Sequence, residues 1–388
     1  MFYQLPPVGN PVQLSCTTPS EDCVQMFDDA YQAHYFASGT AALAAAITAA
    51  IRLKSVERPE VILPAYACPD LISASVFAGA KPVLVDIEAD RPWMNLEQLA
   101  TKITANTVAI IAVHLFGILE RLDLLRPLAA QAGALLIEDS AQAFSRGSEQ
   151  GLWQGDLVIL SFGRGKPVSL LGGGAVLHNK HNSPDGKLAR LIPELITQTD
   201  ENIHQRISFF LKAKLYNWMI NPRLYWLPQS LPFLHLGETR YHPLGSIEGM
   251  ERTKLSMLPA NIKTYRADPM LTQQTLATTL NECDLDRAGI IDLPQACNIT
   301  PTRRLLRYPL LVEPERRQQL YSLLHKQGLG PSRMYPSALP KISGLEEMLS
   351  AQGPFPAATS FAERILTLPT HTGVTQPDID KIRLLISR

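Results

Sequence analysis

The stretch from Leu135 to Val176 constrains the fold most, because it contains two apolar runs that read as buried strands. The first run, Ala134 to Ile137, leads directly into Asp139, which places a carboxylate at the C-terminal tip of a strand. Asp156 to Phe162 reads as the second strand. Open α/β sheets hold their ligands at this edge, so the stretch predicts a ligand site beside Asp139.

A lysine follows the second strand after a turn rich in glycine. The turn is Gly163 to Gly165, Lys166 comes next, and Gly172 to Gly174 follow a few residues later. Glycines allow the backbone to approach a bound molecule closely. A lysine held beside buried strands loses its proton more easily than a surface lysine, and a neutral amine can form a Schiff base. Lys166 is therefore the candidate nucleophile.

Strands and helices alternate in the part of the chain that precedes Asp139. Short apolar runs at Val61 to Pro64, Lys81 to Asp86 and Val108 to Val113 read as strands, and Leu122 to Ala132 reads as a helix. This alternation predicts a parallel sheet. Because 388 residues exceed what one core usually supports, we expect two domains. Residues 1–250 would form the large domain and residues 251–388 a smaller one.

Composition limits the partners and the compartment. Lys plus Arg equals Asp plus Glu at 36 each, so no basic surface for nucleic acid is expected. The five cysteines form no C-x-x-C pair, which favours a reducing cytosol and gives no support for a metal site. The N-terminal residues contain prolines and no basic segment followed by an apolar one, so no signal peptide is predicted. These observations indicate a cytoplasmic enzyme without a metal.

The motifs around Asp139 and Lys166 resemble those of the DegT/DnrJ/StrS family. Its members are pyridoxal-phosphate (PLP) aminotransferases of the aspartate aminotransferase fold type I, and many act on nucleotide-linked keto-sugars. The shared motifs appear as Glu138 to Gln142, Ser161 to Lys166 and Gly173-Gly174. The resemblance implies an α/β fold with a mostly parallel seven-stranded sheet flanked by helices, and a small C-terminal α+β domain. It also implies a homodimer whose sites lie at the subunit interface.

The resemblance further implies a role for individual residues. Lys166 would form the Schiff base with PLP and move the proton, and Asp139 would pair with the pyridinium nitrogen, whose charge makes PLP an electron sink. Gln142 would lie against the ring or its 3-hydroxyl, and Ser161 would bind the phosphate. Further cofactor contacts are expected from Ser38, Gly39, Thr40, Tyr66, Cys68, His114 and Arg252. Substrate contacts are expected from Arg333, Tyr335 and His371.

Several of these roles have structural alternatives. Ser38 to Thr40 precede an Ala-rich helix, whose free N–H groups attract phosphate, but they could form an ordinary helix cap. Many relatives stack an aromatic on the ring where this chain has Cys68, so either Tyr66 covers the ring or Cys68 does; Cys68 could also be a buried structural cysteine. His114 follows a predicted strand and could be a packed histidine with no contact to the cofactor.

The chain departs from the family pattern at several sites. Phe144 and Gly172 replace polar residues close to the expected site. In N-x-R-x-S, the family's Asn reaches the phosphate of the neighbouring subunit; here Arg252 and Lys254 replace the Asn and the Arg. A guanidinium also binds phosphate, although a solvated basic turn is the alternative.

One segment, about 205–236, is divergent and rich in aromatic residues and proline. Its lysines and Arg223 interrupt every long apolar window, so no membrane span is predicted. We expect it to pack on the core or on a second subunit, with an interfacial membrane contact as the alternative. It could also cover the active site. After it, Leu258 to Thr279 reads as one helix that enters the second domain.

The predicted function is transfer of an amino group from glutamate to a nucleotide-linked keto-sugar, or a related carbonyl, in polysaccharide or glycoconjugate biosynthesis. Relatives that act as dehydratases have a histidine in place of the lysine, so Lys166 favours transamination. Arg333 would bind the glutamate carboxylate. Two alternatives stay open: a PLP enzyme that acts on an amino acid, and a non-catalytic member that binds PLP or a partner in regulation. The departures at Cys68, Phe144, Gly172 and Arg252 support the second.

Overall fold

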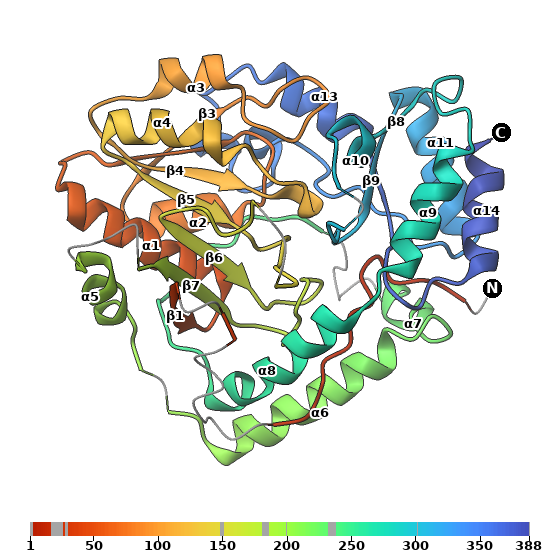
Figure 1. The fold of residues 1–388 in the computed structure, drawn as a ribbon, viewed down its shortest axis with the longest axis horizontal. Coiled ribbons are helices and arrows are strands. Elements are labelled where there is room, and N and C mark those ends of the chain that lie inside the picture. The colour runs from red at the N-terminus through yellow and green to blue at the C-terminus, as the bar shows by residue number, and fades with distance from the viewer. Residues whose placement is uncertain are drawn as a thin grey trace.

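The computed structural model describes residues 3–16, 26–27, 30–147, 151–180, 186–198, 200–231, 238–300 and 302–387. Two β-sheets organise these residues (Figure 1). The larger sheet occupies the left and centre of the view, and the smaller one lies to the right, between helices of the C-terminal part.

The larger sheet has seven strands in the order β1-β7-β6-β5-β4-β2-β3. The strands from β2 to β6 pair in parallel, whereas β7 runs antiparallel to both β1 and β6. The mostly parallel seven-stranded sheet expected from the resemblance is therefore confirmed. Its strands are β1 (Tyr31–Phe36), β2 (Glu60–Pro64), β3 (Lys81–Val85), β4 (Thr107–Val113), β5 (Leu135–Asp139), β6 (Leu157–Ser161) and β7 (Gly174–Asn179).

Helices cover both faces of this sheet because successive strand residues point to opposite sides. On one face, Ile111 of β4 packs in the core formed with α1 (Gly39–Lys54) and α2 (Asp70–Phe77). On the other face, Ile110 packs with residues of α3 (Leu96–Lys102) and α4 (Leu122–Ala132). Both β4 residues are fully buried, which explains why the strand reads as a continuous apolar run.

A long helix and the N-terminal segment cover the β6–β7 part of the sheet. Helix α6 (Ile203–Met219) lies beside α8 (Arg252–Ala267) along the lower edge of the view in Figure 1. The extended N-terminal segment runs between them: Asn217 Oδ1 accepts from the Val12 amide at 2.8 Å, and Asn261 Oδ1 accepts from the Gln13 amide at 2.8 Å. Two shorter helices precede and follow α6 in the chain: α5 (Lys187–Glu194), which packs against α1, and α7 (Trp226–Gln229).

The smaller sheet has three antiparallel strands in the order β10-β9-β8. These are β8 (Ile290–Asp292), β9 (Tyr308–Val312) and β10 (Ile365–Leu368). The accompanying helices are α9 (Leu271–Asn281), α10 (Leu293–Ala296), α11 (Pro314–Lys326), α12 (Glu346–Leu349), α13 (Pro356–Arg364) and α14 (Gln376–Ile386). This part has the α+β character expected of a small domain. The division at residue 250 stays a prediction.

The sequence-based prediction of one helix over Leu258 to Thr279 is wrong. The segment contains the end of α8 and most of α9, separated at Asp268 to Met270. Pro269 disfavours helical geometry at the preceding residue, and Met270 adopts a left-handed conformation with φ 59°.

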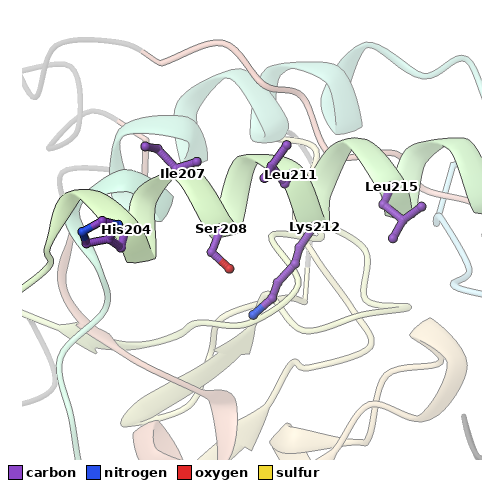
Figure 2. A pocket seen from close by; sticks show the side chains of 6 residues that line it. All are labelled: His204, Ile207, Ser208, Leu211, Lys212 and Leu215. Carbon is purple, nitrogen blue, oxygen red and sulfur yellow. The ribbon is translucent and has the colours of Figure 1, made fainter.

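The divergent segment 205–236 forms most of α6 and all of α7, while its residues 232–236 lie outside the described residues. An apolar stripe on α6 faces outward: Ile203, Ile207, Leu211, Leu215 and Trp218 are each more than half exposed. Figure 2 shows this helix with the side chains that line a shallow pocket of about 330 Å³. Within the described ranges, no helix is long and apolar enough to cross a membrane.

Candidate active site

Asp139 lies at the C-terminal end of β5, where the sequence predicted a carboxylate. Its side chain is buried, and Oδ1 accepts a hydrogen bond from the Ala141 amide at 3.0 Å. No described residue donates a hydrogen bond to the second oxygen, Oδ2. Burial raises the pKa of Asp139, while the Ala141 hydrogen bond and the charge of Lys166 act in the opposite direction. A buried carboxylate with one free oxygen is available to bind a cation.

Lys166 lies in the turn that follows β6, with its side chain partly exposed. The turn is held by Asn10, whose Nδ2 donates to the carbonyl oxygens of Lys166 and Pro167 at 3.1 Å each. Among the described residues, the Lys166 ammonium has no hydrogen bond or ion pair. Burial raises the pKa of Asp139 and of Cys68, and the charge of Lys166 opposes this rise at both groups, so the three side chains lie near one another.

The N-terminus of α1 meets the end of β6 beside the glycine run. Ser38 caps the helix by accepting from the Ala41 amide at 3.0 Å, and it also forms a parallel bridge with Gly173. No described residue accepts from the Thr40 amide. A Cβ on Gly39 would lie 2.9 Å from Ser161 Oγ, and a Cβ on Gly174 would lie 2.6 Å from the Gly39 nitrogen. This close approach requires glycine at both positions and places the N-terminus of α1 next to a hydroxyl, an arrangement suited to an anion.

His114 is a fully buried residue whose two ring nitrogens both have partners. Nδ1 accepts from the Glu120 amide at 3.0 Å, so Nε2 carries the hydrogen and donates to Glu138 Oε1 at 2.9 Å. Only the face of its ring remains for a cofactor. The two ring nitrogens instead hold neighbouring protein groups, as in the packed histidine that the sequence left open as an alternative.

Glu138, which sequence reasoning passed over, connects the strands behind the site. Besides His114, it accepts from the amides of Trp153 at 2.7 Å and Gly155 at 2.9 Å. Burial raises its pKa, but the interaction with His114 and the hydrogen bonds from these two amides outweigh burial, so the pKa of Glu138 is lowered. An ionised Glu138 therefore fixes the backbone on which Asp139 sits. The only sequence signal was an acidic residue inside an apolar strand.

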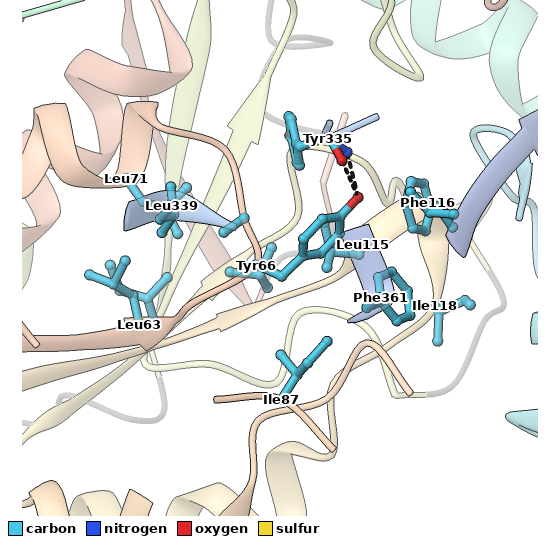
Figure 3. Packing of buried hydrophobic residues seen from close by; sticks show 14 of the residues in the cluster. Leu63, Tyr66, Leu71, Ile87, Leu115, Phe116, Ile118, Tyr335, Leu339 and Phe361 are labelled. Atoms are coloured by element: carbon cyan, nitrogen blue, oxygen red, sulfur yellow. Dashed lines mark hydrogen bonds between the residues drawn. The ribbon is translucent and has the colours of Figure 1, made fainter. Parts of the chain in front are cut away.

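Tyr66 and Tyr335 form the wall between the two sheets (Figure 3). The Tyr66 hydroxyl donates to the Tyr335 carbonyl at 3.1 Å and accepts from the Tyr335 amide. Its ring packs against Phe361, with ring centroids 4.9 Å apart, and is fully buried. Of the two candidates to cover a cofactor ring, Cys68 is partly exposed and Tyr66 is enclosed. Burial and the charge of Asp70 raise the pKa of the Cys68 thiol to about 12, so it remains a neutral, soft surface.

Gln142 connects the turn after β4 with the loop that contains Tyr335. Its Oε1 accepts from the Phe116 amide at 2.9 Å, and its Nε2 donates to the Tyr335 hydroxyl at 3.1 Å. An amide nitrogen has two hydrogens, so one remains for a bound hydroxyl. Phe144, one of the departures, instead packs on Trp153 and Tyr265 away from these polar groups.

Arg252 and Lys254, the two substituted residues on α8, lie in different environments. Arg252 is exposed. Lys254 forms an ion pair with Glu251 at 2.7 Å, and its Nζ lies 3.0 Å from the position of a Cβ on Gly172. The loss of a side chain at Gly172 therefore makes room for the Lys254 ammonium beside the glycine run.

Two predicted substrate residues are engaged elsewhere. Arg333 donates to Gln318 Oε1 at 2.8 Å and lies 4.2 Å from the ring centre of Tyr321, both on α11. His371 Nε2 donates to the Pro6 carbonyl at 2.9 Å, and its Nδ1 accepts from the Gly373 amide at 3.1 Å. His371 thus anchors the N-terminal segment, and its buried ring has a lowered pKa because of desolvation. Both substrate roles stay predictions.

The divergent segment places Tyr216 near the N-terminal residues that hold the lysine turn. The Tyr216 hydroxyl donates to the Asn10 carbonyl at 3.5 Å, and Asn10 in turn holds the Lys166 turn. Burial raises the pKa of Tyr216 to about 12. Burial also raises the pKa of Tyr225, and the charge of Arg307 opposes this. A role for the segment in covering the active site stays a prediction. Within the part of the chain that the structure describes, no cluster of acidic, His or Cys residues could hold a metal ion.

The fold is shared with several solved structures. S. venezuelae DesV, in complex with a ketimine intermediate, aligns with a TM-score of 0.67 and 22% identity over 96% of this chain and 91% of DesV. Helicobacter pylori PseC, an aminotransferase involved in the biosynthesis of pseudoaminic acid, aligns with a TM-score of 0.66 and 17% identity, over 94% of this chain and 88% of PseC.

The sequence itself identifies the family. Residues 21–198 match the DegT/DnrJ/EryC1/StrS aminotransferase family, and this segment belongs to it. Within the curated relatives, GDP-perosamine synthase of Vibrio cholerae is 33% identical over 145 residues, which are 37% of this chain and 38% of that enzyme. The match therefore spans well under half of that relative. The family expected from the motifs at Asp139 and Lys166 is confirmed.

Proposed function

We propose that this protein is a PLP-dependent aminotransferase that moves an amino group from glutamate to a nucleotide-linked keto-sugar. The observation that carries the proposal is the convergence of Asp139, Lys166 and the α1 N-terminus at one end of the large sheet. The family assignment of residues 21–198 supports the reaction type. The names of GDP-perosamine synthase and of PseC, an aminotransferase involved in the biosynthesis of pseudoaminic acid, support a sugar substrate and a role in glycan biosynthesis.

The residues present fit PLP at both of its charged ends. The amides of Gly39 and Thr40 and the Ser161 hydroxyl would hold the phosphate, since helix N-termini bind anions. Asp139 Oδ2 would accept a hydrogen bond from the protonated ring nitrogen, which would supply the opposite charge that this buried carboxylate lacks. One hydrogen of Gln142 Nε2 would reach the ring hydroxyl. The cofactor supplies an electron sink for the substrate carbon when bound.

The protein's own groups would then position the substrate and move its proton. Lys166 Nζ has no partner in the described residues, so it is free to bond to the cofactor and, once released, to take the proton from the substrate carbon and return it. Cys68 would cover one ring face as a neutral thiol. The segment with Tyr216 and Tyr225 would exclude water from the lysine turn.

We also propose a homodimer with sites at the subunit interface. Arg252 is exposed in the single chain, at the start of α8, where its guanidinium could reach a phosphate bound by a second copy. The outward apolar stripe of α6 offers surface of the kind that obligate dimers bury. A homodimer would account for both the exposed Arg252 and the apolar stripe of α6. We propose a cytoplasmic location for it.

A two-step spectroscopic experiment tests this function. Glutamate added to the PLP-loaded protein should convert the cofactor to its pyridoxamine form, and a nucleotide-linked keto-sugar should restore the original spectrum. Pyruvate and oxaloacetate should restore it poorly. Efficient restoration by these keto acids, with every keto-sugar failing, would instead support the amino-acid enzyme. No conversion by any amino donor would support the non-catalytic alternative.

A further inference from the structure

Arg307 lies immediately before β9, and no described Asp or Glu forms an ion pair with its guanidinium. Its Nε is buried and has no hydrogen-bond partner, and Nη1 donates to Ser332 Oγ at 2.7 Å. Burial lowers its pKa, although a guanidinium stays charged under physiological conditions. Because an unpaired buried charge is costly, this site calls for an anionic ligand.

The free edge of this guanidinium matches a carboxylate. Ser332 occupies Nη1, so Nε and Nη2 remain as two parallel donors without a protein acceptor among the described residues. Two parallel N–H groups bind the two oxygens of a carboxylate in one plane. A lysine would offer only a point charge at this position.

Arg307 also lies near Tyr335 and Tyr66, which border the proposed site. Ser332, which holds it, belongs to the same loop as Tyr335, and the Tyr335 hydroxyl accepts from Gln142 at 3.1 Å. Gln142 follows Asp139 by three residues at the end of β5. The charge of Arg307 also acts on the pKa of Tyr225 in the divergent segment. Arg307 thus lies near the small sheet, the Tyr335 loop and Tyr225 of the divergent segment.

We infer that Arg307 binds the carboxylate of the amino donor, and that it does so in place of Arg333. The Arg333 guanidinium already has Gln318 and the Tyr321 ring as partners on α11, whereas Arg307 has an unpaired edge. This inference deepens the proposed aminotransferase function and rests on it. The phosphates of a nucleotide-linked substrate are the other source of an oxyanion, and the test separates the two.

The experiment titrates the PLP-loaded protein with glutarate, a dicarboxylate that lacks the reacting amine, and follows binding by calorimetry. Arg307→Gln should weaken glutarate binding by about tenfold to a hundredfold, because the bidentate contact is lost. Arg307→Lys should give an intermediate loss. Arg333→Gln is the matched control, and it should bind glutarate within about twofold of the wild type. GDP, the second probe, should bind all four proteins equally.

Unchanged glutarate binding in Arg307→Gln would overturn the inference, as would a loss confined to Arg333→Gln. Weaker GDP binding with normal glutarate binding would assign Arg307 to the phosphates and also overturn it. If Arg307→Gln melts well below the wild type, Arg307→Lys decides, provided that it melts normally. A wild type that does not respond to glutamate contradicts the proposed function. A wild type that responds while Arg307→Gln keeps full glutarate affinity contradicts only this inference.

Discussion

Gln142 Nε2 donates a hydrogen bond to the Tyr335 hydroxyl at 3.1 Å, across 193 residues of sequence. The bond joins the loop after β5 to the loop that contains Tyr335, which lies between α11 and β10 of the small sheet. Tyr66 strengthens the junction by bonding both backbone groups of Tyr335. The proposed site is therefore built where the two sheets meet, and its geometry depends on both of them.

Asp139→Asn should leave the cofactor bound and slow the first half-reaction about a thousandfold, or roughly 4 kcal/mol of transition-state stabilisation. An amide cannot balance the charge of a protonated ring nitrogen, whereas the phosphate contacts at α1 are unaffected. Stopped-flow spectra after mixing with glutamate measure the rate. Asp123→Asn, at an exposed position on α4, should behave as the wild type. A fully active Asp139→Asn protein would show that another acid serves the ring.

Mixing two inactive variants tests the shared dimer. If Arg252 acts on the partner's phosphate, heterodimers of Lys166→Ala with Arg252→Ala have one site without both groups and one intact site. Random mixing should then restore about a quarter of wild-type activity. Lys166→Ala mixed with Asp139→Asn is the control, since both groups belong to one subunit's site, and it should restore none. A monomer in sedimentation, or equal results from both mixtures, argues against the interface site.

Cys68 should resist alkylation at pH 8. Raising the thiol pKa to about 12 through burial and the charge of Asp70 lowers the thiolate fraction by roughly a thousandfold from that of an ordinary thiol. Cys16 is exposed and provides an internal reference, while Cys23 lies outside the described residues. Iodoacetamide followed by peptide mass spectrometry should modify Cys16 first. Rapid labelling of Cys68 in the native protein would contradict the buried, neutral thiol.

His34 should make the fold sensitive to acid. Burial and the neighbouring His178 lower the pKa of His34 to about 4, compared with 6.5 in an unfolded chain. Between these values the unfolded state binds more protons, so stability is complete above about pH 6.5 and falls as the pH approaches 4. The free energy of unfolding should fall by about 3 kcal/mol from this group.

Urea titrations from pH 7 to pH 4 measure this effect. His34→Gln should flatten the pH dependence, and His204→Gln, at an exposed position on α6, should leave it as in the wild type. An unchanged slope in His34→Gln would mean that other groups cause the acid sensitivity.

The strands of the large sheet were predictable because each one is an apolar run that the fold buries on both faces. Val108 to Val113 reads as a strand, and the structure extends it by one residue to Thr107. Asp139 and Lys166 were recognisable because each follows such a run. The break between α8 and α9 was missed, since the apolar spacing continues through Asp268 to Met270 while Pro269 interrupts the helix.

Side-chain partners across the fold could not be predicted in the same way. Arg307 and Arg333 look alike in the sequence, and only packing shows that Arg333 has partners on α11 and that Arg307 has a free edge. Asn10 likewise gave no signal, although it holds the lysine turn from the other end of the chain. Such contacts arise when distant segments meet, which no local pattern records.

Reduction of the loaded protein with borohydride tests the central claim most directly. If Lys166 is the residue that bonds to PLP, borohydride should fix the cofactor to the protein, and peptide mass spectrometry should find the added mass on Lys166 alone. Lys166→Ala should retain no fixed cofactor, while Lys254→Ala, which changes the other ammonium beside the glycine run, should be labelled as the wild type. Fixation at a different lysine, or unaltered fixation in Lys166→Ala, would contradict the assignment of the site.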